Sequence, residues 1–415
     1  MSIMKPFAIA PRLGPWPALL ALVALAAAGV LLLGSRSDEG GNAAARVEQD
    51  GACSVRVGGS RWAVGDGSFR ATADYGRHGD GWFREITTVV RASGGRVVAY
   101  DARRGVVTIL DARLDSVGGF GGLGGGPGEL AGMLVPRPGP RRWLTVTDSV
   151  VRVYDGRAVH LFSTDGGFLG REEYLPGSAS PFSVRAVHAS PGGIVYAVET
   201  EGGRGEGGRL EVRAASGPDG DRRLFGIGLA APPSEGGVTF YSRTQPAPLF
   251  AARGRCLYVS DGEHEWVARY DAVTGELDSV PLPPHEVDAE EQRHPDVESR
   301  ARSLIASVVQ GRTGERPKSV ALPSMASAAV LRWTGMIVDP DGHVWIRPWR
   351  KASARQEAGP VRVYRVNPAT GAAEEATLPA FPVAFGEPGV FYARARSPVT
   401  DELYLARFDL TPEGR

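Results

Sequence analysis

A four-stranded unit repeats along most of this chain, and that repeat constrains the fold more than any other feature. In its clearest copy, a hairpin of two apolar strands is followed by a longer gap and then by a second hairpin. The four apolar runs of this copy are 86–92, 97–101, 106–111 and 115–119, and the turn of the first hairpin is 93–95. Four antiparallel strands within about 35 residues are typical of one blade of a β-propeller.

The first turn of the unit recurs six times, and an apolar strand follows each copy. The six turns are 93–95, 147–149, 190–193, 253–255, 339–342 and 386–389. The last copy holds only three strands before the sequence ends. We therefore expect the strand-like segment 54–64 to supply the fourth strand and to close the ring, because closure removes exposed sheet edges.

Glycine and proline are abundant, with 56 Gly and 31 Pro among 415 residues, whereas the two together usually make up about 12% of a chain. They lie between short runs of Val, Ile, Leu, Tyr and Trp, so they indicate many turns rather than disorder. The sequence predicts an all-β fold, a six-bladed β-propeller with four-stranded antiparallel blades over 52–411.

The N-terminus carries an export signal. Lys5 and Arg12 precede the run 17–33, which contains no charged residue. That length fits either a cleaved signal peptide or a signal-anchor transmembrane helix over 1–34, and both alternatives stay open. Basic residues on the N-terminal side predict that the following chain lies outside the cytoplasm, periplasmic or secreted. The small and polar residues of 35–51 predict a flexible linker.

One blade resembles a known repeat family. Val97-Val98-Ala99-Tyr100-Asp101 and Val106-Val107-Thr108-Ile109-Leu110-Asp111 are followed by Gly126-Pro127-Gly128-Glu129-Leu130, and a partial second copy begins at Asp341. This sequence resembles the NHL-type repeat of six-bladed, TolB-like propellers. The resemblance implies the fold, and such propellers include scaffolds, ligand sensors and a few hydrolases and lyases.

The long connections are expected on one rim of the ring. Turns between the first and second strands and between the third and fourth strands are short, while the other rim receives 121–133, 201–208, 228–245, 281–332 and 349–359. Long loops on a rigid scaffold are common recognition surfaces. A helix is predicted from Pro295 to Gly311, within a helical insertion over about 285–320.

Aromatic and basic side chains on this rim are the candidate ligand-binding residues. They are Tyr241, Arg243, His264, Trp349, Arg350 and Lys351. Such side chains suit an anionic or a carbohydrate ligand, and the alternative is that they are solvated rim residues.

Several apparent motifs are better explained by turns and strands. Gly119 to Gly124 has the glycine spacing of a dinucleotide site, but no helix follows it. Asp339 to Gly342 begins like a calcium loop, but its twelfth position is Arg350. His264-Glu265 begins like a zinc-protease helix without a second His.

The two cysteines are expected to be unbridged. Cys53 is placed beside the last blade and Cys256 in a strand two blades away, so their Cα atoms would lie farther apart than a disulfide allows.

The sequence favours a non-catalytic binding or scaffold propeller that recognises a protein, glycan or small ligand through its long loops. Its 47 basic and 47 acidic residues are balanced, which gives no support for nucleic-acid binding. We expect a monomer that contacts the membrane only through its N-terminal segment, and we predict no cofactor and no catalytic residue. The alternative is a metal-assisted hydrolase, lactonase or lyase with a divalent cation in the central channel. A structural spacer without a ligand is the third possibility.

Overall fold

The computed structural model describes most of the predicted propeller. The described residues are 53, 71–75, 83–130, 144–147, 149–155, 158–172, 184–190, 193–200, 208–216, 220–229, 234–235, 238–239, 247–288, 303, 306–307, 310, 314, 330–350, 360–397 and 402–410. The chain divides into two compact units, Met1–Glu48 and Gln49–Arg415. The first unit, with the predicted export segment 1–34, lies outside the described residues.

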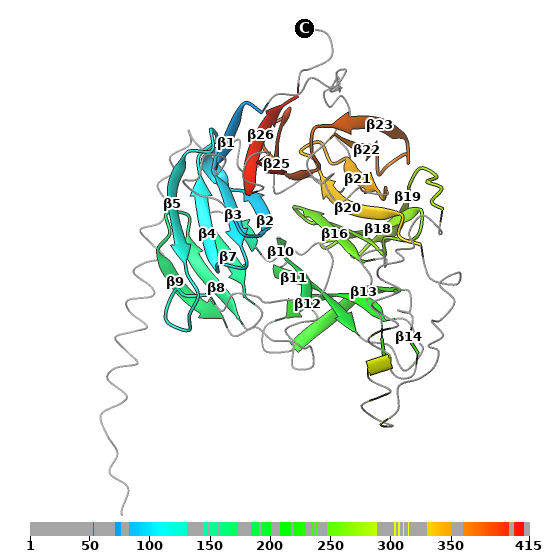
Figure 1. Cartoon of the computed structure of the whole chain (residues 1–415), viewed down its shortest axis with the longest axis horizontal. Helices are drawn as coiled ribbons and strands as arrows, with labels where there is room; N and C mark the ends of the chain where they lie inside the picture. The colour runs from blue at the N-terminus through cyan, green and yellow to red at the C-terminus, as the bar shows by residue number, and fades with distance from the viewer. Residues whose placement is uncertain are drawn as a thin grey trace, which may run out of the picture. The chain divides into compact units, whose positions relative to one another are not determined.

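Six four-stranded antiparallel sheets form the second unit, and Figure 1 shows them following one another along the colour gradient. Blade 1 contains β2 (Ile86–Arg91), β3 (Val97–Asp101), β4 (Val106–Leu110) and β5 (Ser116–Gly121). Blade 2 contains β6 (Leu144–Thr147), β7 (Val150–Tyr154), β8 (Val159–Ser163) and β9 (Phe168–Glu172). Blade 3 contains β10 (Val184–Ser190), β11 (Gly193–Thr200), β12 (Arg209–Ser216) and β13 (Gly220–Gly228).

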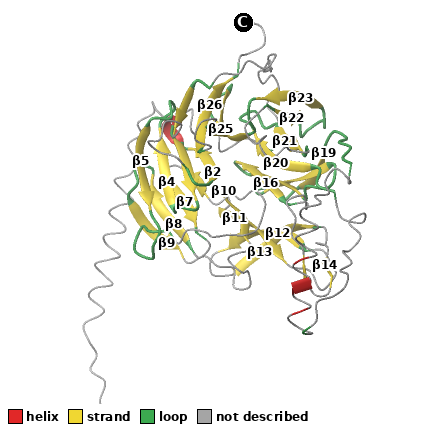
Figure 2. Cartoon of the chain, in the orientation of Figure 1, coloured by secondary structure: helices red, strands yellow, loops and turns green. Residues whose placement is uncertain are grey.

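The second half of the chain repeats this order. Blade 4 contains β16 (Leu249–Arg253), β17 (Cys256–Ser260), β18 (Trp266–Asp271) and β19 (Leu277–Pro281). Blade 5 contains β20 (Trp333–Val338), β21 (Val344–Pro348), β22 (Val361–Val366) and β23 (Ala373–Leu378). Blade 6 contains β24 (Pro382–Phe385), β25 (Val390–Arg396), β26 (Leu403–Asp409) and the N-terminal strand β1 (Ala73–Tyr75). The predicted all-β six-bladed propeller is therefore confirmed, and strands account for nearly all of the regular structure described (Figure 2).

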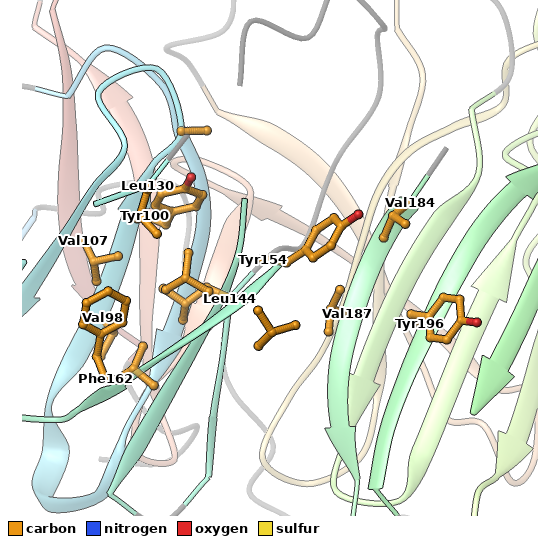
Figure 3. Close-up of a cluster of buried hydrophobic side chains, with 14 of the residues drawn as sticks. Val98, Tyr100, Val107, Leu130, Leu144, Tyr154, Phe162, Val184, Val187 and Tyr196 are labelled. Carbon is orange, nitrogen blue, oxygen red and sulfur yellow. The ribbon is translucent and has the colours of Figure 1, made fainter. Parts of the chain in front are cut away.

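The blades pack face to face because their second strands are apolar on both sides. In β3, Val98 and Tyr100 belong to the cluster shared with blade 2, while Val97 and Ala99 belong to the cluster shared with blade 6. Successive side chains of a strand point to opposite faces, so a strand buried between two neighbours reads as a continuous apolar run. Figure 3 shows Val98 and Tyr100 in the first of these clusters, which continues through blade 2 to Tyr196 of blade 3.

The ring closes through contacts between the innermost strands of neighbouring blades. β2 contacts β6, β6 contacts β10, β10 contacts β16, β16 contacts β20, β20 contacts β24, and β24 contacts β2. β1 completes blade 6 by pairing with β26, with Ala73 opposite Arg407 and Tyr75 opposite Leu405. Closure by an N-terminal strand is thus confirmed, but the strand is β1. The segment 54–64, to which we had assigned this role, lies outside the described residues.

The expectation of unbridged cysteines is wrong. Cys53 and Cys256 form a disulfide with a Cα–Cα distance of 5.4 Å, and Arg269 Nη1 donates a hydrogen bond to the backbone oxygen of Cys53 at 3.1 Å. The error follows from the misassigned closing strand. Because β1 rather than 54–64 pairs with β26, Cys53 is not held beside blade 6 and can reach the start of β17 in blade 4.

One rim of the ring is tied together by hydrogen bonds between blades. We call it the turn rim, because it holds the connections between first and second strands and between third and fourth strands. Arg91 Nη1 donates to the oxygen of Gly386 at 3.1 Å, and Arg253 Nη1 donates to the oxygen of Asp339 at 2.7 Å. His188 Nε2 also bonds the oxygen of Gly254 at 2.9 Å. These bonds fix the short turns of one blade to the next, so the turn rim is mainly structural.

Asp339 organises the turn of blade 5 on this rim. Its Oδ1 accepts hydrogen bonds from the backbone of Asp341 and His343, each at 2.9 Å. Its Oδ2 accepts from Trp345 Nε1 at 2.9 Å and from Arg365 Nε at 3.2 Å. The carboxylate is almost fully buried and satisfied by protein donors. The sequence around Asp339 is therefore a hairpin turn, as predicted, and not a calcium loop.

The opposite rim, which we call the loop rim, receives the long connections 122–143, 229–248, 282–332 and 349–360. Within them, β14 (Ser234–Glu235) pairs with β15 (Val238–Thr239). Ser303, Ala306, Ser307 and Gln310 are helical, and Ser307 Oγ donates to the oxygen of Ser303 at 2.9 Å. The other residues of the predicted helix lie outside the described residues. No helix among the residues described is both long and apolar enough to cross a membrane.

Candidate functional site

Three blades place an aspartate where the second strand meets the loop rim. In blade 1, Asp101 accepts hydrogen bonds from the backbone N–H groups of Arg84 and Arg103, at 2.7 and 3.1 Å. In blade 2, Asp155 Oδ1 accepts from the backbone of Ala158 at 3.1 Å. In blade 4, Asp261 occupies the same position. Aspartates of this kind replace missing backbone acceptors in a tight turn, so their first role is structural.

Two of these aspartates also bond a histidine, and the two histidines differ sharply in exposure. His160 Nε2 lies 2.9 Å from Asp155 Oδ2, and only 5% of the His160 side chain is exposed. His264 Nδ1 lies 2.6 Å from Asp261 Oδ2, and 58% of its side chain is exposed although that of Asp261 is only 6% exposed. The pair in blade 2 therefore belongs to the core, while the pair in blade 4 presents an imidazole to solvent.

Asp261 fixes both the position and the tautomer of His264. Its Oδ1 accepts hydrogen bonds from the backbone of Glu263 and His264, each at 2.9 Å. With Nδ1 donating to a buried carboxylate, the neutral imidazole carries its lone pair on Nε2. This arrangement gives the loop rim an oriented group that can accept or donate a proton or a hydrogen bond.

Gly262 allows this turn to form. Its φ is +82°, and a Cβ added there would lie 2.7 Å from the backbone oxygen of Ala247. A positive φ and so close a backbone approach both favour glycine. The oxygen of Gly262 accepts hydrogen bonds from the backbone of Arg332 and Trp333, at 2.9 and 3.0 Å. The turn of blade 4 is thereby fastened to the start of β20 in blade 5.

The buried indole of Trp333 strengthens the same junction. Trp333 is fully buried, and its Nε1 donates to the backbone oxygen of His264 at 2.9 Å. Its ring also packs against His285, with ring centroids 5.5 Å apart.

Glu265 and Arg332 connect this junction to two further segments. Glu265 Oε1 accepts from the backbone of His285 at 3.0 Å and lies 3.5 Å from Arg332 Nη1. Arg332 Nη1 also donates to the backbone oxygen of His285. The backbone oxygen of Arg332 accepts from the N–H of Trp349 at 2.6 Å, and His285 Nε2 bonds the oxygen of Trp349 at 3.1 Å.

These contacts define one site, which we call the rim cluster. It comprises His264, Glu265, Trp266, His285, Arg332 and Trp349. The buried residues Asp261, Gly262 and Trp333 hold these side chains in place through hydrogen bonds. Segments from the turn of blade 4, from both ends of the connection 282–332, and from the end of β21 in blade 5 meet here. Because backbone hydrogen bonds link them, the exposed side chains rest on a rigid base.

The surroundings shift the pKa of two groups in opposite directions. Burial lowers the pKa of His285, the hydrogen bond with the Trp349 backbone opposes this shift, and the charges of Arg362, Arg332 and Arg350 lower the pKa further. Burial also raises the pKa of Glu263, and the charge of Asp261 acts in the same direction. The lowered pKa favours the neutral form of His285, which serves as a hydrogen-bonding link.

The structure brings together half of the predicted ligand-binding residues. His264 and Trp349 lie in the rim cluster, and the exposed Arg350 follows Trp349 directly. Tyr241, Arg243 and Lys351 lie outside the described residues. Sequence reasoning missed Glu265, Trp266, His285 and Arg332. His285 and Arg332 stand at opposite ends of the longest connection, so no spacing in the sequence places them side by side.

Polar residues also occur where the innermost strands begin near the loop rim. In β10 the pairing shifts between Val184 and Ala186, so Arg185 is the extra residue of a bulge. Its Nε donates to Glu199 Oε2 at 2.6 Å. In β20 the pairing shifts between Trp333 and Gly335, and Arg347 Nε donates to Thr334 Oγ1 at 2.8 Å. Bulges re-aim side chains at such positions. Within the described part of the chain, no three His, Cys, Asp or Glu side chains gather as metal ligands would.

Comparison with known proteins assigns the chain to no family. No protein-family model and no curated protein matches the chain. A luciferin-regenerating enzyme is 11% identical with a TM-score of 0.43, over 82% of this chain and 95% of its own. A Bacteroides fragilis protein designated as exported is 10% identical with a TM-score of 0.46, over 86% and 98%. The calcium-binding protein regucalcin from Agrobacterium tumefaciens is 14% identical with a TM-score of 0.40, over 84% and 96%.

These similar structures include enzymes and other proteins. At these identities, the similarity carries no information about a ligand or a reaction.

Proposed function

We propose that this protein is an extracytoplasmic binding propeller that recognises its ligand through the loop rim, at the rim cluster. One observation carries the proposal: the exposed His264 is held by the buried Asp261 on a base that links blades 4 and 5. A solvated surface side chain needs no such support. Binding sites need it, because side chains ordered in advance lose less entropy when a ligand binds.

Two features support a location outside the cytoplasm. The disulfide between Cys53 and Cys256 is of the kind that persists in oxidising compartments. The uncharged run 17–33, preceded by Lys5 and Arg12, is typical of an export signal. The ligand is accordingly expected among the proteins, glycans or small molecules of the cell envelope or the medium.

A second candidate function is a hydrolase or lyase, favoured by the pair of Asp261 and His264. A carboxylate that holds Nδ1–H and leaves Nε2 free is the arrangement in which a histidine acts as a general base. The measurement that separates the two functions is turnover against a panel of esters, lactones and glycosides. Catalysis requires a product that forms with wild type and is lost in His264→Gln, whereas a binding protein gives none.

The proposed function is tested by comparing a variant of the loop rim, at blades 4 and 5, with a variant of the turn rim of blade 4. The loop-rim variant combines His264→Ala and Trp349→Ala. The matched turn-rim variant is Val273→Ala, since Val273 is 57% exposed between β18 and β19. Full-length wild type and both variants are immobilised and incubated with solubilised envelope proteins and glycans, and the retained molecules are identified and quantified.

We expect wild type and the turn-rim variant to retain the same molecule and the loop-rim variant to lose it. Equal retention by all three proteins, or loss in the turn-rim variant alone, would place recognition elsewhere. Thermal midpoints of the three proteins are measured alongside, so that misfolding is not taken for lost binding.

A further inference from the structure

The two basic groups within the rim cluster that face a ligand, His264 and Arg332, are each paired with a carboxylate, and the exposed Arg350 lies beside the cluster. This pairing favours a carbohydrate over an anionic ligand. His264 bonds Asp261 at 2.6 Å, and Arg332 lies 3.5 Å from Glu265. Glu263, which directly precedes His264, adds another carboxylate. An anion would have to displace a carboxylate from His264 or from Arg332, and it would approach the remaining acidic groups at close range.

The aromatic side chains of the cluster suit a carbohydrate. Trp266 and Trp349 are each partly exposed at the loop rim. The ring of His264 stacks on that of Trp266 at a centroid distance of 6.2 Å and an interplanar angle of 29°. The face of a sugar ring carries C–H groups that pack on an indole, while its hydroxyl groups need both donors and acceptors around the edge. Indole side chains supply such contact area and lose little conformational freedom.

The polar groups needed at the edge of a sugar are present next to these rings. The Glu265 side chain is 40% exposed and the Arg332 side chain 30% exposed, so a carboxylate acceptor and a guanidinium donor both reach solvent. The exposed Nε2 of His264 adds a third hydrogen-bonding group. Paired ionic groups of this kind bond hydroxyls without requiring a charge on the ligand.

We propose that the ligand of the rim cluster is an uncharged carbohydrate, with sugar rings packed on Trp266 or Trp349 and hydroxyl groups bonded by Glu265, Arg332 and His264. This inference rests on the proposed function, because it names the ligand class of the same site. It does not depend on the long loops outside the described residues.

The test uses the full-length protein and oligosaccharides of known charge. The neutral probes are hexasaccharides of glucose and of N-acetylglucosamine, and the anionic probes are a hexagalacturonate and a heparin-derived hexasaccharide. Tryptophan fluorescence reports binding at low and at high salt. We expect at least one neutral probe to bind with an affinity that salt does not change, because screening acts only on charged ligands.

Three variants locate the binding. Trp266→Ala and Trp349→Ala are each made, and at least one is expected to weaken the neutral probe about tenfold. Glu265→Gln discriminates between the ligand classes: it is expected to weaken a neutral sugar that donates a hydroxyl to the carboxylate, whereas it would tighten an anion. Phe168→Ala is the matched control, since Phe168 is 40% exposed on β9 of blade 2, and it should bind as wild type does.

Each outcome decides the inference. Binding of anionic probes alone, with salt-dependent affinity and tighter binding by Glu265→Gln, would overturn it. Binding of neutral probes that survives in both tryptophan variants would also overturn it, and so would the absence of binding by every probe. If no probe binds, the two-rim comparison shows whether the proposed function fails as well as the carbohydrate inference. If a protein ligand is retained, and its retention requires His264 and Trp349, then only the carbohydrate inference fails. Thermal midpoints, together with Glu265→Gln, keep the test valid if a tryptophan variant fails to fold.

Discussion

Removing the disulfide should lower the stability of the propeller by a predictable amount. The bond joins residues separated by 203 positions. In the chain-entropy treatment, a loop of that size reduces the freedom of the unfolded chain by about 5 kcal/mol at 25 °C. Unfolding entropy is roughly 2.1 cal/mol/K per residue, or about 0.9 kcal/mol/K for 415 residues. The double variant Cys53→Ser/Cys256→Ser should therefore melt about 6 °C below wild type.

The assay is calorimetry of the full-length protein with and without a reductant. Reductant should lower the melting temperature of wild type to that of the double variant, and it should leave the double variant unchanged. Two thiols should become titratable in denatured wild type only after reduction. A difference below about 1 °C, or free thiols in the unreduced protein, would refute the reasoning. Either result would mean that this bond does not restrict the unfolded chain as assumed.

Three further predictions concern single residues, each checked by chemical denaturation of the full-length protein. Gly262→Ala places a Cβ against the oxygen of Ala247 at a positive φ, so it should destabilise by about 1–3 kcal/mol and weaken binding at the rim cluster; an unchanged midpoint would contradict the assigned turn. Tyr100→Phe removes a fully buried hydroxyl that has no hydrogen-bond partner among the described residues, so it should leave stability unchanged or raise it by up to ~1 kcal/mol, and a clear loss would indicate a missed partner. Asp339→Asn removes the nearer of the two carboxylates beside the buried Arg365, at 3.2 Å, and leaves that of Asp341 at 3.7 Å. It should cost about 1–3 kcal/mol, and a loss below about 0.5 kcal/mol would argue against the network.

Asp339 also makes a prediction about acid stability. Burial by itself raises the pKa of its carboxyl, but hydrogen bonds from His343 and Trp345 and the charges of His343 and Arg365 outweigh it and hold the pKa below its ordinary value. The lowered pKa contributes stability that is complete above the ordinary pKa of about 4 and is lost as the pH falls through the lower pKa of the folded state. Asp339→Asn should therefore reduce the fall in the free energy of unfolding between about pH 4 and lower pH. An unchanged pH dependence would mean that other carboxyl groups cause this fall.

The blades were predictable from the sequence because their strands are buried on both faces. Val97 to Asp101 was predicted residue for residue, and the other strands of blade 1 were predicted to within two residues. A strand between two neighbouring sheets must be apolar throughout, and glycine-containing turns mark its ends. The same signals recur in every blade, so the number of blades followed from counting turns.

The closing strand and the disulfide could not be predicted in the same way. β1 has only three residues, Ala73 to Tyr75, which are too few for their alternation of apolar and polar side chains to stand out in the sequence. Its partner β26 lies at the other end of the chain, so neither length nor pattern identifies it. The longer apolar segment 54–64 was a more conspicuous candidate, and assigning it to closure moved Cys53 away from Cys256.

The candidate site was predictable only in part. Exposed aromatic and basic residues on a predicted rim identified His264 and Trp349, because such residues are more common at binding surfaces than on other surfaces. His264 and His160 each follow an aspartate at the end of a second strand, but His160 lies in the apolar run 158–162, whereas His264 stands between Glu263 and Glu265. Exposure distinguishes them, and exposure depends on how neighbouring blades pack.

Hydrogen exchange tests most directly the claim that the loop rim is the recognition surface. Backbone amide exchange of the full-length protein is measured with and without the molecule retained in the two-rim comparison. The rim cluster predicts slower exchange on binding in residues 261–266, 282–288, 331–334 and 347–350, with the turn-rim segments 92–96, 339–342 and 386–390 unchanged. Slower exchange confined to the turn rim, with no change around His264 and Trp349, would contradict the claim.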